Sequence, residues 1–178
     1  MPFLLRKIRK ARWYKHDRVP WLIEGDLQAD ALDDLRTTGN KLSIYLIDDD
    51  DTTLERVASA LVTANTEYIS DFEYALIGYE VFQELDIKSE DSEGETPDGL
   101  VNSWHRDLLE LTAVKIVALA NAIQTRAERK VFLKRRVTRM VLDALATQQL
   151  DRARMKPALL EKLDRITDPG APSGSSRA

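Results

Sequence analysis

The stretch that decides the fold is residues 103–148, SWHRDLLELTAVKIVALANAIQTRAERKVFLKRRVTRMVLDALATQ, which contains no Gly or Pro and is dense in apolar residues. Asn102 and Ser103 are typical helix N-caps, because their side chains accept hydrogen bonds from the free N–H groups of a first helical turn. We therefore predict that a helix begins near Trp104. It forms the central pillar of the domain, as one long helix or as two helices end to end.

Large and small apolar side chains alternate along one stripe of this predicted helix. At intervals of three and four residues, the stripe contains Leu109, Ala113, Ile116, Ala120, Ile123 and Ala127. Small residues let a neighbouring backbone come close while large ones interlock, so the stripe predicts a helix–helix seam. A membrane span is the alternative, but Glu110 and Lys115 interrupt the run, which falls short of the ~20 apolar residues that cross a bilayer.

The stripe breaks after Ala127, where it would next place Lys130 and Lys134 inside, and a new apolar stripe starts at Leu133. The helix is therefore expected to bend or to end there. The opposite face of this second half is strongly cationic and carries Arg126, Arg129, Lys130, Lys134, Arg135, Arg136 and Arg139. Such a face is either solvated or binds an anion.

The chain before residue 40 gives weaker signals. The segment from Phe3 to Trp13 fits either a short strand or an ordered arm. Trp13, Tyr14 and Trp21 stand among basic residues, a pattern that suits stacking on nucleic-acid bases but more often anchors a segment to the core. An amphipathic helix capped by Asp26 is expected to follow and to end near residues 39–40.

The middle of the chain predicts a strand–loop–helix unit. Apolar residues alternate from Lys41 to Ile47, which indicates a strand. Four consecutive aspartates follow at residues 48–51. Thr52 and Glu55 then have the spacing of a capping box, which predicts the start of the next helix.

The remaining segments alternate between structured and loop signals. Residues 68–85 predict a strand followed by a short helix, and residues 88–99 predict an exposed acidic loop. Pro157 suits the first turn of a last helix. Residues from Asp168 onward are rich in Pro, Gly and Ser and predict a disordered tail.

Together these signals predict a helix-dominated α+β fold. A single domain covers residues 1–166, with a mixed strand and helix N-terminal half (1–87), the acidic loop (88–99) and a helical half (102–166). In this arrangement the N-terminal half packs on the central helix of residues 103–148, and a C-terminal helix follows. Residues 167–178 form the tail.

Composition excludes several classes of function. The 178-residue chain has no cysteine, which rules out disulfides, thiolate metal sites and cysteine catalysis. The apolar run before Arg6 is too short for the core of a signal peptide, so we expect a cytoplasmic protein without a membrane association. Two basic ends, with net charges of +6 (1–20) and +8 (112–178), flank an acidic middle of −18 (21–111). The ends are expected to fold back on the middle or to attract charged partners.

Candidate catalytic and metal-binding groups are few. Consecutive aspartates such as Asp48–Asp51 point in different directions, so we predict a capped, solvated loop and no metal or cofactor. His105 has Ser103 and Asp107 nearby, but residues two apart on a helix face away from each other. His105 is therefore predicted to be a surface residue in a first helical turn. His16 is the only other histidine, and no phosphate-binding loop, nucleophile elbow or zinc motif is present.

Two functional hypotheses follow. The first is a non-catalytic protein–protein interaction or regulatory module that contacts a partner or its own copies. Its acidic surface would neutralise a basic partner, as in an antitoxin-like or immunity-like protein, and its seam would join copies or an assembly partner. The alternative is a nucleic-acid or polyanion binding protein that uses the basic helix face 126–139, assisted by the aromatic N-terminal segment. A metal-dependent hydrolase built on Asp48–Asp51 is a third and weaker reading.

Overall fold

The computed structural model describes residues 3–9, 12–13, 26–48 and 50–168. Its centre is one six-stranded antiparallel sheet with the strand order β4-β5-β2-β1-β3-β6. The strands are β1 (Phe3–Lys7), β2 (Leu42–Ile47), β3 (Phe72–Gly78), β4 (Lys88–Asp91), β5 (His105–Leu109) and β6 (Glu128–Phe132). The helices are η2 (Ala29–Leu35), α1 (Asp51–Thr63), α2 (Glu80–Glu84), α3 (Gly99–Ser103), α4 (Ala113–Arg126), α5 (Lys134–Ala146), η3 (Arg152–Arg154) and α6 (Pro157–Thr167).

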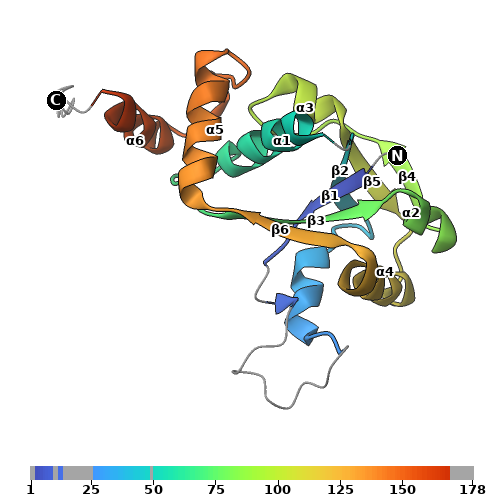
Figure 1. The fold of residues 1–178 in the computed structure, drawn as a ribbon. Helices are drawn as coiled ribbons and strands as arrows, with labels where there is room; N and C mark the ends of the chain where they lie inside the picture. Colours follow the sequence, from blue (N-terminus) through green and yellow to red (C-terminus); the bar gives the residue numbers. More distant parts are fainter. Residues whose placement is uncertain (1–2, 10–11, 14–25, 49, 169–178) are drawn as a thin grey trace.

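Helices cover both faces of the sheet, so the fold is α+β with two cores. Helices α1, α3 and α5 lie on one side of the sheet, while η2 and α4 lie on the other (Figure 1). Strand β2 shows why: Tyr45 and Ile47 belong to the first core, and Leu42 and Ile44 belong to the second. A strand buried on both faces has apolar residues at consecutive positions. Among the described residues, no helix is long and apolar enough to cross a membrane.

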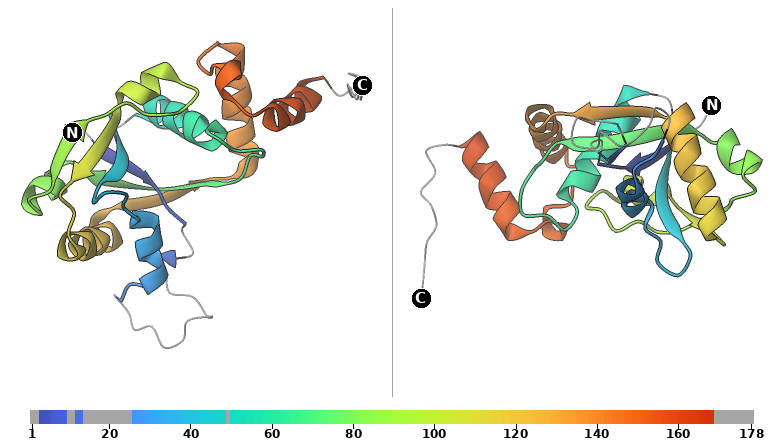
Figure 2. Two further views of the ribbon diagram at one scale, coloured as in Figure 1. Left: turned by 180° about the vertical axis from the view of Figure 1, so that it is seen from behind. Right: turned by 90° about the horizontal axis from the view of Figure 1, so that it is seen from below.

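The predicted central helix over residues 103–148 is wrong. In this stretch the chain forms the end of α3, strand β5, helix α4, strand β6 and helix α5. The left view of Figure 2 shows α4 and α5 as separate helices on different sides of the sheet. The break in the apolar stripe at Ala127 is real, but the chain leaves the helix there for a strand instead of bending.

Long-range pairing explains why the local helix signal failed. Strand β5 is hydrogen-bonded on both sides, to β2 and to β4, and β6 pairs with β3 over five residues. Such tertiary pairing overrides intrinsic helix propensity. A helix start is present inside the stretch, at Thr112, whose hydroxyl accepts a hydrogen bond from the Lys115 N–H at 3.3 Å.

The sheet joins the two predicted halves of the chain. Strands β5 and β6 come from residues assigned to the helical half, yet they are neighbours of β2 and β3. The segment predicted as an exposed acidic loop starts with the edge strand β4, and its end is buried at Thr96, Pro97 and Asp98. Of the predicted tail, Thr167 ends α6 and residues 169–178 lie outside the described part.

Several local predictions are confirmed. The alternation at residues 41–47 is β2, residues 68–85 hold β3 and then α2, and Pro157 opens α6. The N-terminal segment contains strand β1. The helix expected after Asp26 is a 3-10 helix with Gln28 at its N-cap, and α1 is capped by Asp50 instead of the predicted Thr52.

Asp34 of η2 anchors the N-terminal segment to the core. Its carboxylate accepts hydrogen bonds from the Arg9 N–H at 2.7 Å and from the Trp13 indole Nε1–H at 2.9 Å, and it forms an ion pair with Arg12. Trp13 is only 1% exposed. The anchoring interpretation therefore holds for Trp13, while Tyr14 and Trp21 lie outside the described residues.

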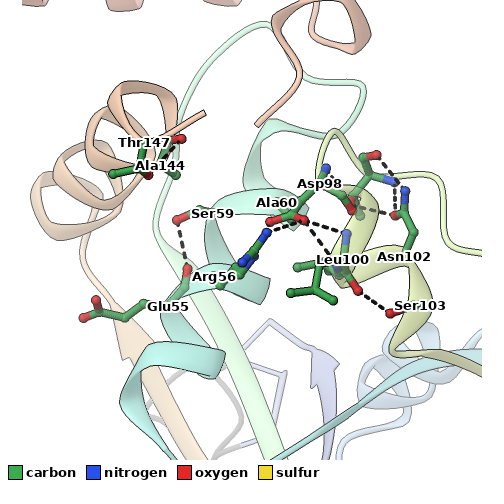
Figure 3. Close-up of polar contacts among 12 residues, drawn as sticks. Glu55, Arg56, Ser59, Ala60, Asp98, Leu100, Asn102, Ser103, Ala144 and Thr147 are labelled. Carbon is green, nitrogen blue, oxygen red and sulfur yellow. Dashed lines mark hydrogen bonds and ion pairs between the residues drawn. The ribbon is translucent and has the colours of Figure 1, made fainter. Parts of the chain in front are cut away.

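A buried ion pair joins α1 to the turn before α3. The Asp98 carboxylate accepts hydrogen bonds from Arg56 Nε at 2.6 Å and Nη2 at 3.0 Å, and also from the N–H groups of Leu100 and Val101 (Figure 3). The Asp98 side chain is 1% exposed, whereas that of Arg56 is 25% exposed. Because the Asp98 carboxylate accepts hydrogen bonds from both α1 and the first turn of α3, the pair fixes α3, and with it the start of β5, against α1.

Replacing Asp98 with alanine should lower the free energy of unfolding by about 3–5 kcal/mol, because Arg56 and two N–H groups lose their shared acceptor. Asp164→Ala is the matched control, since it removes an ion pair with Arg152 whose side chains are both more than half exposed. Its cost should stay below about 1 kcal/mol. Urea denaturation measures both values. Equal losses would show that the buried pair contributes no more than the exposed one.

Burial raises the pKa of Tyr45 from its ordinary value of 10.0 to about 12, although the nearby Arg6 charge opposes the shift. The folded protein therefore holds the Tyr45 proton at a pH where the unfolded chain has lost it. The resulting stability is present below pH 10.0 and is lost as the pH rises toward 12. We expect the wild-type protein to lose stability relative to Tyr45→Phe over this range. The free energy of unfolding of both proteins is measured by denaturation at several alkaline pH values. If the difference between the two proteins does not change with pH, the expectation is wrong.

Candidate functional site

The seven predicted basic residues do not share one helix face. Arg126 ends α4, Arg129 and Lys130 lie in β6, and the other four lie in α5. The prediction of a continuous cationic face over 126–139 is therefore wrong, because strand β6 separates the two helices. The spatial grouping of these residues depends on a strand that the sequence pattern did not reveal, and their binding of a polyanion stays a prediction.

Carboxylates neutralise several members of this set. Arg126 forms a bidentate pair with Glu84, Lys130 pairs with Glu128 at 2.5 Å, and Arg136 pairs with Glu55 at 2.7 Å. The hydrogen bond from Arg126 lowers the pKa of Glu84, which is the expected sign for a carboxylate beside a cation.

Arg129 is used within the fold. Its Nη1 donates to the Trp13 carbonyl oxygen at 3.0 Å and to the side chain of Gln124. The predicted contact of the basic ends with the acidic middle is made by other residues, in the pairs Arg12–Asp34, Arg126–Glu84 and Arg136–Glu55.

The cations that remain form one group at the start of α5. Lys134, Arg135 and Arg139 make no ion pair with any described residue, and all three are exposed. The apolar Leu133 beside them is 63% exposed. We call these four residues the α5 patch. Leu133, Arg135 and Arg139, together with Arg136, line a surface hollow of 330 Å³.

Neighbouring elements hold the α5 patch in place. Leu133 at the N-cap has no side chain that could cap the helix, and the Asp71 carboxylate accepts the Lys134 N–H at 2.6 Å instead. The Arg136 guanidinium lies 4.3 Å from the centre of the Phe132 ring, a cation–π contact. Val137, Met140, Val141 and Ala144 form the inner face of α5, which packs in the same core as α1.

The electrostatics of the patch favour an anionic ligand. Lys134, Arg135 and Arg136 occupy the first turn of α5, where the helix dipole disfavours positive charge. Asp71 and Glu55 offset part of this cost. Arg135 and Arg139 are separated by one helical turn and keep their guanidinium groups exposed, so they are able to form bidentate hydrogen bonds with carboxylates.

The predicted helix seam is divided between elements. Leu109 lies in β5 and Ala127 is the C-cap of α4, while the other four residues lie in α4. Ala120 and Ile123 are buried in the second core of this chain, and Ala113 is exposed. The buried part of the stripe therefore packs against its own sheet and η2, and contact of this stripe with a partner stays a prediction.

The aspartate run caps a helix. Asp50 accepts hydrogen bonds from the N–H of Thr53 at 2.7 Å and from its hydroxyl at 2.5 Å, which lowers the pKa of Asp50. Asp51 is the first residue of α1. Asp49 lies outside the described residues, and the described ones contain no group of three side chains that could hold a metal ion.

The prediction for His105 is wrong. It lies in β5 and is 8% exposed, not at the surface of a helical turn. Its Nδ1 is 2.8 Å from the Ser92 hydroxyl, and its ring meets the edge of Tyr45 at 5.2 Å between centroids. Asp107 instead accepts a hydrogen bond from the Ser43 hydroxyl. His16 lies outside the described residues.

Comparison with protein-family models, with curated proteins and with solved structures finds no match to this chain. A function must therefore be argued from the geometry of the chain itself.

Proposed function

We propose that this protein is a non-catalytic interaction module that binds an acidic segment of a partner protein through the α5 patch. One observation carries the proposal: Arg135, Arg139 and the exposed Leu133 line a hollow, and neither of these arginines forms an ion pair with a described residue. The other predicted basic residues are used inside the fold. Antitoxin-like, immunity-like and assembly proteins are classes that would use such a surface.

The chemistry of the patch suits a protein ligand. Arginine is enriched at the centre of protein interfaces, where its planar group pairs with carboxylates and its stem packs on apolar side chains. Leu133 supplies an apolar contact beside Arg135 and Arg139. A partner segment in which acidic and apolar side chains alternate would pair with the arginines and also pack on Leu133.

Nucleic acid is the weaker reading. Affinity for a phosphate backbone grows with the number of cations that contact it. The pairing of Arg126, Lys130 and Arg136 with carboxylates leaves only a small group available, in a chain of net charge −4. The observations therefore favour a protein over a polyanion, and the experiment below includes both.

Charge reversal at Arg135 and Arg139 together should abolish binding of an acidic peptide in which Glu and Leu alternate. We expect fluorescence anisotropy to show at least an approximately tenfold loss of affinity, about 1.4 kcal/mol, because two carboxylate contacts become repulsive. Arg154→Glu is the matched control, since Arg154 is also exposed and makes no ion pair with described residues but lies in η3. Binding of wild-type protein should weaken as salt is added.

A double-stranded DNA probe of similar charge is measured in parallel. Tighter binding of the DNA than of the peptide would overturn the proposal in favour of the polyanion reading. Arg154→Glu changes the net charge by half as much as the double reversal, so a loss of binding free energy in the double reversal that is only twice that of Arg154→Glu would show that the peptide senses only net charge. Light scattering reports whether a second copy of the chain is the partner.

Leu133→Ser should weaken the Glu/Leu peptide severalfold while leaving binding of a Glu-only peptide unchanged, because only the former has an apolar side chain to bury. Thermal unfolding should stay unchanged, since Leu133 is 63% exposed. Equal weakening of both peptides would instead indicate that Leu133 only positions the arginines.

A further inference from the structure

Strands β1 and β2 separate at one end of the sheet. Their pairing stops at Leu5 and Tyr45, yet β1 continues along β3 as far as Lys7, and β2 continues along β5 as far as Leu42. Arg6 bridges the opening: its Nη1 donates to the Ser43 carbonyl at 2.7 Å and its Nε to the Asp34 carbonyl at 2.9 Å. A side chain thus replaces backbone hydrogen bonds, and both of its acceptors are uncharged.

A cavity of 440 Å³ lies at this opening. Its walls come from β1, β2 and β5, from the C-terminal end of α1 at Asn65, and from the segment 93–96 before α3. Small-molecule sites usually measure roughly 300–1,000 Å³, so the cavity is large enough for a small polar compound. It is separate from the α5 patch and shares no residue with it.

Two buried polar side chains line this cavity with unused hydrogen-bonding capacity. Tyr45 and His105 are each 8% exposed. The Tyr45 hydroxyl has no hydrogen bond to any described residue, and His105 uses Nδ1 for Ser92 but has no described partner at Nε2. No buried side-chain N or O atom of the described residues lacks a hydrogen-bond partner, so the Tyr45 hydroxyl and His105 Nε2 are themselves open to solvent, where a ligand can replace water.

Opposite charges line the same cavity without pairing. Lys7 lies on the β1 wall, and Glu93 and Glu95 lie on the segment before α3. None of the three forms an ion pair with a described residue. Burial and the nearby Arg9 lower the pKa of Lys7, as expected for an ammonium group that no carboxylate compensates. In addition to burial, Arg6 lowers and Glu95 raises the pKa of Tyr45, so charges of both signs act on its hydroxyl.

We propose that this cavity binds a small zwitterion that carries a carboxylate and an ammonium group. The ligand carboxylate meets Arg6, Lys7 and the Tyr45 hydroxyl, and the ammonium group meets Glu93 and Glu95. A ligand with separated charges complements both walls, whereas a simple anion or cation would satisfy one wall and be repelled by the other. The proposal is independent of the interaction proposed for α5.

The test uses linear probes that differ only in charge. The zwitterions 4-aminobutanoate, 5-aminopentanoate and 6-aminohexanoate are compared with pentanoate and pentylamine, by following amide chemical shifts of the full isotope-labelled chain. At least one zwitterion should bind about tenfold more tightly than either singly charged compound, with shifts centred on β1, β2 and residues 93–96. If no zwitterion binds, or if pentanoate or pentylamine binds as tightly, the proposal is wrong.

Two variants locate the binding. Tyr45→Phe removes one hydroxyl and should weaken the zwitterion about tenfold. Tyr68→Phe is the matched control, because Tyr68 is 65% exposed and does not line the cavity. Glu95→Gln should weaken the zwitterion without weakening pentanoate, an effect that a merely structural role of Glu95 would not produce. Equal affinity of wild-type protein and Tyr45→Phe would overturn the assignment of the site.

Discussion

The ion pair between Arg56 and Asp98 is the contact on which the order of the sheet depends. Two residues far apart in sequence meet there, and Asp98 also caps α3, whose end leads directly into β5. Next to it, Asn102 accepts hydrogen bonds from the N–H and hydroxyl of Thr96. A buried charge is costly unless hydrogen bonds compensate it, and the Asp98 carboxylate accepts four, three at Oδ1 and one at Oδ2. The main effect of the pair is therefore to fix the position of β5 beside β2. Its net contribution to the free energy of unfolding is the smaller effect.

Charge segregation along the sequence has a physical use in this fold. The basic N-terminal segment meets Asp34, Arg126 meets Glu84, and Arg136 meets Glu55, so ends and middle are held together by contacts between opposite charges. Most of these pairs are exposed and each contributes little. These pairs also limit which cations a partner can reach: of the seven basic residues predicted between 126 and 139, Lys134, Arg135 and Arg139, all in the α5 patch, form no ion pair with a described residue.

The sequence predicted elements whose signals are local. The alternation from Lys41 to Ile47 and the proline at 157 each correspond to an observed element, because a strand buried against a core and a helix start leave marks within a few residues. The long helix failed because the strand character of β5 and β6 is imposed by distant partners. For the same reason, the sequence listed the seven basic residues but could not predict which of them lie together in the fold. The cavity at Tyr45 and His105 left no sequence signal, since its walls are assembled from segments between residues 5 and 107.

The two ends of helix α1 lie near the two proposed sites. Glu55 near its N-terminus holds Arg136 beside the α5 patch, while Asn65, just past its C-terminus, lines the cavity. Thirteen residues make a helix about 20 Å long, which exceeds the distance over which exposed charges interact at physiological salt. Direct electrostatic coupling between the sites is therefore weak. Coupling through movement of α1 would be restrained by the Arg56–Asp98 pair.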